Sequence, residues 1–321
     1  MEIRKLRQIK MRHLLAFVET VRAGSLKAAA GRINLTQPAI SKTLKDLEDI
    51  LGAPLLLRDR GGIALTREGS VFRQFAEQSL ASLGHGLSSI EALNLGISAP
   101  LRLGALPSVA AVFLPDAVQR FAELSPSTPV TVDDGGIGTL IDRLRAGELD
   151  IVVGRMGRPE RMTGLSFTQL YSEQVVFVVA ADHPCARATD LAELAGQKLL
   201  YPPEDAAIRP LVDRFMLSEG ITGWPDRLET VSGAFGRAMT LGPARAVWLI
   251  SQGVVAGDIA AGRMVAVPID TTAMAGPVGI MARSEEEPTP PVRLFRQALF
   301  ETLDAGGMPP DQSSSAPIDV T

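Results

Sequence analysis

The sequence has few of the residues that build disulfide scaffolds and metal sites, and it lacks the long apolar runs of membrane spans. A single cysteine, Cys185, excludes an internal disulfide framework and fits a reducing cytoplasm. The three histidines are scattered and show no metal-ligand spacing. No apolar run approaches the roughly 18 residues that a membrane span needs. The first ten residues are charged and polar, with no apolar signal core behind them. We therefore expect a cytoplasmic protein with no cofactor, no bound metal and no membrane partner.

Motifs for catalysis are also missing. There is no Gly-x-Ser-x-Gly elbow, no P-loop and no dinucleotide fingerprint. The loop 135–138 is rich in glycine, but it lacks the Lys and Ser/Thr of a phosphate loop, so it better suits close backbone approach to a ligand. His183 and Cys185 form a candidate redox pair, although a lone loop cysteine is more often inert. The sequence predicts no catalytic residue and hence no enzyme.

Length and charge indicate more than one domain. The 321 residues suffice for two or three cores, and the hydrophobic fraction of 46% is typical of a globular protein. The net charge of −4 is unevenly distributed. Residues 1–75 carry 14 Lys and Arg side chains against 7 Asp and Glu, and the remaining residues carry 18 against 29. A basic N-terminal module on an acidic body indicates that only the first part binds phosphate groups.

The most informative segment is a predicted helix that follows Thr36. The Thr36 hydroxyl can cap the helix, and Pro38 falls in the first turn, where no backbone N–H is needed. Ile40, Leu44, Leu47 and Leu51 recur at the spacing of a buried helical stripe. Other faces carry side chains that can bind base edges and phosphates, namely Gln37, Ser41, Lys42 and Lys45. Taken alone, the same pattern also describes an ordinary solvated face.

The neighbouring segments favour DNA binding. Residues 11–23 carry an amphipathic stripe that ends at Gly24, and Ser25 can cap a second short helix over 26–33. Two short helices joined by a tight turn form a helix-turn-helix. Residues 54–66 then read as strand, glycine turn and strand, which predicts a wing. The candidate DNA-binding residues are Ser25, Thr36, Gln37, Pro38, Ser41, Lys42, Lys45, Arg58 and Arg60.

These motifs resemble the winged helix-turn-helix of LysR-type transcriptional regulators. The resemblance is colinear over about the first 70 residues, with Leu56 at a position where the family usually has Phe. It implies double-stranded DNA with a pseudo-palindromic operator as a partner, self-association from dimer to tetramer, and contact with RNA polymerase. The matching residues are Ala28-Ala29, Thr36-Gln37-Pro38-Ala39, Ser41, Leu47-Glu48, Leu51-Gly52, Pro54-Leu55, Arg58, Leu65-Thr66 and Gly69.

A long helix is predicted over 67–95. Its apolar residues recur every three or four positions, as in a heptad seam, and suggest pairing with a second copy. The alternative is a long helix packed on its own domain. Two interior glycines, Gly84 and Gly86, each weaken the helix by about 1 kcal/mol relative to Ala. In the family that this chain resembles, the segment is the dimerising linker helix. The seam residues are Phe72, Ala76, Leu80, Leu83, Leu87, Ile90 and Leu93.

From residue 101 onward, strands and helices alternate, which predicts an α/β domain with parallel sheets. The resemblance implies two lobes like those of periplasmic solute-binding proteins, with the chain crossing between the lobes near 165–170 and 269–277.

The predicted fold class is therefore α+β multidomain: a winged helix-turn-helix, a linker helix and a bilobed α/β effector domain. The expected domains are 1–66 for DNA binding, 67–98 for the linker, 99–305 for the effector, and 306–321 as a disordered tail. Lobe I would take 99–168 and 270–305, and lobe II 169–269. The expected strands are 101–106, 130–133, 151–154, 175–181, 198–201, 246–251, 264–269 and 278–283; the expected helices are 110–124, 139–146, 206–217, 235–240, 254–261 and 292–303.

Strand-to-helix loops are the candidates for a ligand cleft, because ligands of two-lobed α/β domains bind beyond the carboxyl ends of strands. Ser108 can hold an anion or merely cap a helix. Arg209 and Arg237 can clamp a carboxylate or remain surface arginines. The cluster of Arg155, Arg158 and Arg161 is assigned to a solvated loop. The candidate effector-binding residues are Ser108, Val109, Gly136, Ile137, Thr139, Pro202, Arg209, Ser232, Phe235 and Arg237.

The effector half is most similar to LysR-type regulators of protocatechuate catabolism. That resemblance implies an activator of ring-cleavage genes that senses a small carboxylate such as a carboxymuconate. The alternatives are a LysR-type regulator of sugar uptake, a solute-binding or enzymatic α/β protein, and a non-specific nucleoid protein, which the acidic body disfavours. The similar stretches are 103–107, 147–155, 170–173, 208–210, 229–232, 234–238, 246–255 and 276–279.

Overall fold

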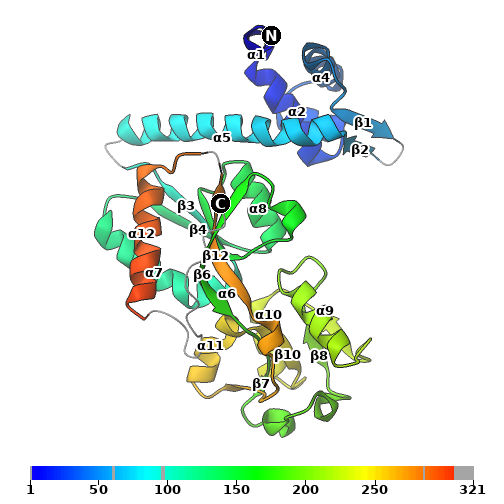
Figure 1. Ribbon diagram of the computed structural model, residues 1–321, viewed down its shortest axis with the longest axis vertical. Helices are drawn as coiled ribbons and strands as arrows, with labels where there is room; N and C mark the ends of the chain where they lie inside the picture. The colour runs from blue at the N-terminus through cyan, green and yellow to red at the C-terminus, as the bar shows by residue number, and fades with distance from the viewer. Residues whose placement is uncertain (1, 60–61, 95–97, 285, 307–321) are drawn as a thin grey trace. The chain divides into compact units, whose positions relative to one another are not determined.

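The computed structural model describes residues 2–59, 62–94, 98–284 and 286–306 (Figure 1). Contacts divide the chain into two compact units, residues 1–91 with 145–148 and residues 92–144 with 149–321. Two predictions fall outside the described residues: the DNA contact of Arg60 and the disorder of the tail from residue 307 onward. Of the described residues, none belongs to a helix long and apolar enough to cross a membrane.

The first unit begins with four helices and a two-stranded wing. The elements are α1 (Glu2–Gln8), α2 (Met11–Ala23), α3 (Leu26–Arg32), α4 (Gln37–Leu51), β1 (Leu56–Asp59) and β2 (Gly62–Leu65). Gly24, with a φ of +65°, ends α2 in the left-handed conformation that glycine adopts without steric cost. The sequence analysis did not expect α1. Its Lys5 Nζ donates to the carbonyl of Leu51 at 2.8 Å, which satisfies a free carbonyl at the end of α4.

Polar residues of the N-terminal motif tie α4 to the wing. Glu48 Oε1 accepts hydrogen bonds from the backbone N–H groups of Leu55 and Leu56 at 2.7 and 3.2 Å. The Thr66 hydroxyl donates to the carbonyl of Pro54 and accepts from the N–H of Gly69, both at 2.8 Å. Glu48 and Thr66 therefore specify how α4 and the wing are joined. The apolar residues beneath α4 and the wing form one core. That core includes Phe17, Ile40, Leu44, Leu47 and Leu55.

The helix α5 (Arg67–Asn94) continues through Gly84 and Gly86 without interruption. The predicted seam along it divides into two parts. Phe72, Ala76 and Leu80 pack into the core of the first unit, as the alternative for this helix anticipated. Leu83, Leu87 and Ile90 remain 51%, 65% and 57% exposed. The side chain of Leu93 and the backbone of Leu95 lie outside the described residues.

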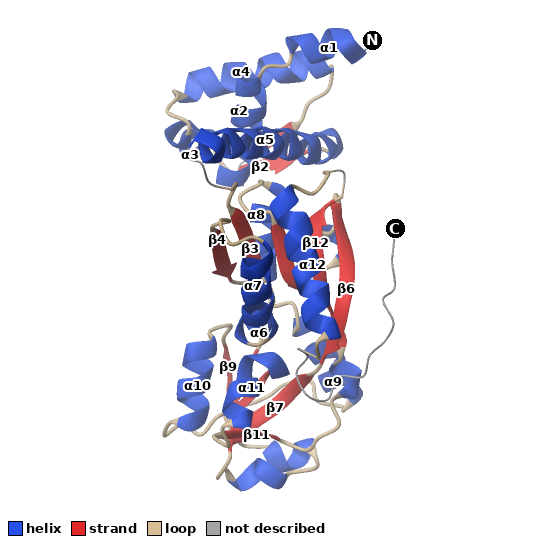
Figure 2. Ribbon diagram, turned by 90° about the vertical axis from the view of Figure 1, so that its left-hand side faces the viewer, coloured by secondary structure: helices blue, strands red, loops and turns tan. Residues whose placement is uncertain are grey.

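The second unit contains two five-stranded sheets, which we call lobe I and lobe II (Figure 2). In lobe I the strand order is β4-β3-β5-β12-β6, and in lobe II it is β11-β7-β10-β8-β9. Lobe I consists of β3 (Leu101–Ala105), β4 (Val130–Asp134), β5 (Ile151–Arg155), β6 (Leu165–Glu173) and β12 (Gly276–Arg283). Lobe II consists of β7 (Val175–Ala180), β8 (Leu199–Tyr201), β9 (Arg227–Glu229), β10 (Val247–Ser251) and β11 (Met264–Ala266).

The sheets are mixed, so the expectation of parallel sheets was wrong. In lobe I, β12 runs antiparallel to both β5 and β6. In lobe II, β7 runs antiparallel to both β10 and β11. The antiparallel strand of each lobe is the one by which the chain enters from the other lobe. The reversal therefore follows from the two crossings, which hydrophobic alternation within single strands does not reveal.

Two strands were not expected from the sequence, β6 and β9. The strand β6 belongs to the sheet of lobe I and ends at Glu173. The chain therefore passes to lobe II at Gln174 rather than near 165–170. The burial along β6 does not alternate cleanly, which explains why no strand was predicted there. The strand β9 has only three residues and lies at the edge of its sheet.

Helices cover both sheets. They are α6 (Pro107–Ala111), α7 (Phe113–Leu124), α8 (Ile137–Arg145), α9 (Arg209–Ser218), α10 (Gly233–Leu241), α11 (Gln252–Ala260) and α12 (Pro290–Asp304), with short turns η1 (Pro159–Arg161), η2 (Pro184–Arg187), η3 (Leu191–Leu194) and η4 (Thr272–Met274). The single helix expected over 110–124 is interrupted at Val112. Against lobe I, α7 and α12 lie side by side, with the rings of Phe121 and Phe295 5.7 Å apart (Figure 1).

Candidate functional site

The structure places the predicted recognition helix, α4, with one face in the core and one in solvent. Ile40, Leu44 and Leu47 are buried. Gln37, Pro38, Lys42 and Lys45 are exposed, and Ser41 is half-buried. The Thr36 hydroxyl accepts the N–H of Ala39 at 3.4 Å, and the Ser25 hydroxyl accepts the N–H of Ala28 at 3.1 Å. Both hydroxyls thus cap helices and still have a proton to donate to a phosphate. Arg58 lies on β1.

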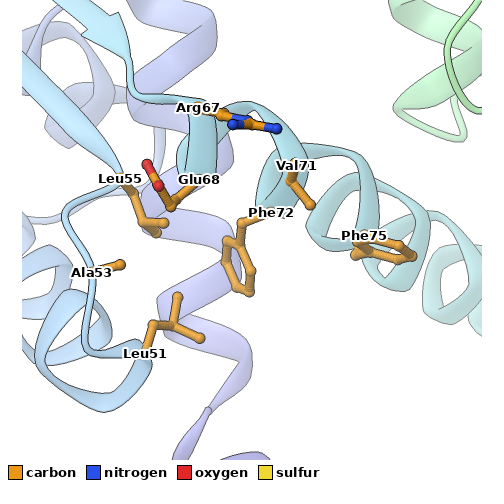
Figure 3. A pocket seen from close by; sticks show the side chains of 8 residues that line it. All are labelled: Leu51, Ala53, Leu55, Arg67, Glu68, Val71, Phe72 and Phe75. Atoms are coloured by element: carbon orange, nitrogen blue, oxygen red, sulfur yellow. The ribbon is translucent and has the colours of Figure 1, made fainter.

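A hollow of about 390 Å³ lies between the first turns of α5 and the end of α4 with the loop that follows it (Figure 3). Apolar side chains from both sides line it, while Arg67 and Glu68 contribute charged groups. Val71 and Phe75, which belong to it, are 58% and 48% exposed. An apolar hollow of this kind suits packing against another apolar surface better than binding a polar ligand. Its lining residues are Leu51, Ala53, Leu55, Arg67, Glu68, Val71, Phe72 and Phe75.

A larger cavity of about 570 Å³ lies between lobe I and lobe II. Caps and first turns of five helices line it, from α6, α8, α9, α10 and α11. Helix starts carry partial positive charge, although at α11 the N–H groups of Gln252 and Gly253 already donate to Gln174 and Glu173. Several such ends around one cavity favour an anion. The sequence analysis expected strand-to-helix loops to meet in this way.

Six of the ten candidate effector-binding residues line this cavity: Ser108, Gly136, Ile137, Pro202, Ser232 and Arg237. The other four lie elsewhere. Val109 is fully buried in the core of lobe I. Thr139 and Phe235 are exposed on α8 and α10. Arg209 donates from Nε to Asp213 at 2.7 Å and from Nη1 to Glu229 at 3.2 Å, and its guanidinium lies over the Tyr201 ring. Its charge is thus shared with two carboxylates of lobe II.

Arg237 forms the charged wall of the cavity on the lobe II side. Its Nε donates to Asp258 Oδ2 at 2.5 Å, and Arg263 Nη2 donates to the other oxygen of Asp258 at 2.6 Å. Burial opposes ionisation of Asp258, but the hydrogen bonds and charges of Arg263 and Arg237 outweigh it and lower the pKa of Asp258. One carboxylate therefore serves two guanidinium groups, and a net positive charge remains at this wall.

The prediction that Arg155 lies on a solvated loop was wrong. Arg155 is the last residue of β5, it is only 3% exposed, and it lines the cavity. Arg158 and Arg161 are exposed, as expected. The buried strand that precedes Arg155 was the signal that could have found it, because ligand cavities of α/β domains lie beyond the carboxyl ends of parallel strands.

The carboxylate of Glu173, at the end of β6, joins the two lobes beneath the cavity. It is 1% exposed. Its Oε2 accepts from the hydroxyl of Ser108 at 3.0 Å, and its Oε1 accepts from the N–H of Gly253 in lobe II at 3.2 Å. Arg155 Nη2 donates to the backbone carbonyl of Glu173 at 2.7 Å and lies 3.4 Å from its Oε2. A buried charge with these partners holds the first turns of α6 and α11 against the first crossing.

Comparisons with known proteins agree with this architecture. The model for the LysR substrate binding domain matches residues 95–304, and the model for the bacterial regulatory helix-turn-helix protein of the lysR family matches residues 11–70. The chain therefore belongs to the LysR family of transcriptional regulators. This confirms the resemblance and the multidomain fold class.

Relatives and solved structures extend the match over nearly the whole chain. The chain is 40% identical to the transcriptional regulator PcaQ of Agrobacterium fabrum over 296 residues, which covers 92% of this chain and 95% of PcaQ. It is 34% identical to the transcriptional regulator YdcI of Escherichia coli over 92% of this chain and 96% of YdcI. Its fold is similar to that of full-length CbnR complexed with target DNA, with a TM-score of 0.54, 21% identity, and coverage of 92% and 100%. These relatives are regulators, so the expectation of a protein that is not an enzyme is confirmed.

Two glycines of α11 test the junction at Glu173. A Cβ on Gly253 would lie 2.7 Å from Glu173 Oε1 and 2.8 Å from the carbonyl oxygen of Ser108, whereas a Cβ on Gly257 meets nothing within 4 Å. We expect Gly253→Ala to lower the free energy of unfolding by about 1–3 kcal/mol through overpacking. Gly257→Ala should raise it by up to about 1 kcal/mol. Denaturant unfolding followed by tryptophan fluorescence measures both, and equal effects would contradict the tight junction.

Proposed function

We propose that this regulator senses a small carboxylate in the cavity between its lobes and activates genes of protocatechuate-type catabolism. The observation that carries the proposal is the cavity itself, which is lined by the starts of five helices and by the side chains of Arg155 and Arg237. The 40% identity to PcaQ supports the choice of pathway. As an activator it would act in the cytoplasm and contact RNA polymerase, for which family membership is the support.

We propose that α4 enters the major groove of a pseudo-palindromic operator. The support is the exposure of Gln37, Lys42 and Lys45 on the face of α4 opposite its buried stripe. Ser25, Thr36, Pro38, Ser41, Arg58 and Arg60 are proposed to contact the same DNA. Hydroxyls that cap α3 and α4 would donate to phosphates, because helix starts also attract phosphate groups.

The DNA contacts are tested by removing single side chains. Gln37→Ala should cost about 1–3 kcal/mol at the operator and change the sequence preference, because Gln reads base edges. Lys42→Ala should weaken operator and random DNA alike, because it would contact phosphate. Lys198→Ala removes the same charge from lobe II and should change neither affinity. Fluorescence anisotropy with an operator selected from random DNA measures these affinities, and unchanged binding by both α4 variants would refute the recognition helix.

We propose that the exposed part of α5 pairs with a second copy of the chain, and that dimers assemble further into a tetramer. The support is the apolar surface that α5 leaves uncovered in one chain. Val71 and Phe75 expose it beside the hollow of Figure 3, and Leu83, Leu87 and Ile90 expose it further along. A second α5 has the same side chains at the same spacing and can cover them.

Charges on this surface should separate the copies. The double variant Leu83→Glu, Leu87→Glu should sediment as a smaller species and lose operator affinity, because two half-sites must be engaged together. Leu217→Glu, at a comparably exposed leucine of α9, should leave both properties unchanged. Sedimentation velocity and anisotropy on the full chain give the result, and an unaltered sedimentation coefficient for the double variant counts against pairing through α5.

The effector class is tested with a panel of small molecules. Carboxymuconate, muconate and protocatechuate should raise the melting temperature of the purified protein, because binding to the native state stabilises it. Arg237→Gln should weaken binding about 10- to 150-fold, as expected for a lost charge-assisted hydrogen bond. Arg209→Gln, outside the cavity, should not, and neither variant should change operator binding without ligand. A response to galactose but to none of the acids would favour the sugar-uptake alternative.

A further inference from the structure

We propose that Glu48 is a positioning residue for operator recognition. Its side chain holds the wing at one place relative to α4, so that the recognition helix and the wing meet DNA as a single rigid body. The inference rests on the proposed binding of DNA by α4 and by the wing. It goes further by assigning a role in DNA binding to a residue that would touch no DNA itself.

The first observation is that one residue accepts every backbone N–H group from the end of α4 to the start of the wing. The backbone carbonyl of Glu48 accepts those of Gly52 and Ala53, at 2.8 and 3.3 Å. Its carboxylate oxygen Oε1 accepts those of Leu55 and Leu56, at 2.7 and 3.2 Å. The residue between the two pairs is a proline, which has no N–H to donate. The carbonyl bonds could form with any residue at this position, whereas the two carboxylate bonds depend on the Glu48 side chain.

The second observation is that the two carboxylate bonds lie at the base of the wing. Leu55 and Leu56 are 2% and 8% exposed, and Leu56 is the first residue of β1, where it pairs with Leu65 of β2. Thr66, which follows β2, donates its N–H to the carbonyl of Leu55 at 3.0 Å. Hydrogen bonds to a charged acceptor are strong, and leaving buried N–H groups unpaired is costly. The carboxylate of Glu48 therefore fixes the base of both wing strands to α4.

The third observation is that Glu48 is poorly suited to bind DNA directly. It lies near the end of α4, roughly 16 Å along the helix axis from Gln37 at the start. Its negative charge repels phosphate groups, so a carboxylate on a DNA-reading helix needs a role that offsets this repulsion. Fixing the wing supplies that role. A wing that is free to move loses conformational freedom when it binds DNA, whereas a wing already held in place does not.

Three substitutions separate the reach of the Glu48 side chain from its charge. Glu48→Gln is neutral but keeps the length and an oxygen that can accept both N–H groups, Glu48→Asp keeps the charge but is one methylene shorter, and Glu48→Ala removes both properties. If reach matters, the Glu48→Gln variant should bind operator DNA within about twofold of the unmodified protein, and the other two should bind it about 5- to 30-fold more weakly. If charge alone matters, the Glu48→Asp variant would match the unmodified protein and the two neutral variants would bind more tightly, which overturns the inference.

The contribution of the wing gives a readout that a mere loss of stability would not change. Arg58→Ala, on β1, should weaken operator binding by about 5- to 30-fold in the unmodified protein. Combined with Glu48→Asp or Glu48→Ala it should have less than about a twofold effect, because a wing that is no longer held contributes little with or without Arg58. Combined with Glu48→Gln it should have its full effect. Fluorescence anisotropy on the full chain, with an operator selected from random DNA, measures these affinities, and circular dichroism verifies that each variant is folded.

The matched control is Glu19→Ala, which removes a half-buried carboxylate that pairs with Arg22 and Arg32 in the same unit. In that background Arg58→Ala should keep its full effect.

The outcomes separate this inference from the proposed function. An effect of Arg58→Ala that is the same in every Glu48 background overturns the inference and leaves DNA binding by α4 and the wing standing. If Arg58→Ala has no effect in the unmodified protein, the proposed wing contact and the inference both fail, while the recognition helix is still judged by Gln37→Ala and Lys42→Ala.

Discussion

The burial of one carboxylate, that of Glu173, constrains the whole effector half. A charge that is 1% exposed must have all its hydrogen-bonding capacity satisfied, and its partners come from three elements. Ser108 brings the first turn of α6, Gly253 brings the first turn of α11, and Arg155 brings the end of β5. Because Glu173 is also the last residue of β6, this network lies where the chain passes from one lobe to the other. The cavity above it is thus bordered by groups whose positions depend on each other.

The same carboxylate connects the lining of the cavity to the contact between the lobes. Ser108 and Arg155 both line the cavity and both interact with Glu173, which also binds Gly253 in the other lobe. The bonds of Ser108 and Arg155 to Glu173 lie within lobe I, and the bond from Gly253 to the same carboxylate joins the two lobes. The lining of the cavity and the contact between the lobes thus share one carboxylate. The family to which the chain belongs links such a domain to a winged helix-turn-helix.

Prediction from the sequence succeeded wherever the chemistry is local. The caps at Ser25 and Thr36, the glycine after α2 and the buried stripe of α4 are specified by residues within a few positions of each other. The convergence of helix starts on one cavity was also predicted, because it follows from the general geometry of α/β sheets. What failed involves a partner distant in sequence. Arg155 turned out to be buried rather than solvated, and the residue that it contacts, Glu173, lies 18 positions further along the chain. That choice of partner leaves no local trace in the sequence.

The sequence by itself determined the family, the order of DNA-binding, linker and effector segments, and the fold class, because these depend on short motifs and on periodicity. Only the tertiary structure decided the direction of β7 and β12, the division of the α5 seam into a packed and an exposed part, and the place of Arg155 in the cavity. The physical reason is the distance along the chain over which each kind of interaction acts. Capping and helical periodicity act over a few residues, whereas strand direction, burial of an arginine and sharing of a carboxylate are set by segments that meet only when the chain has folded.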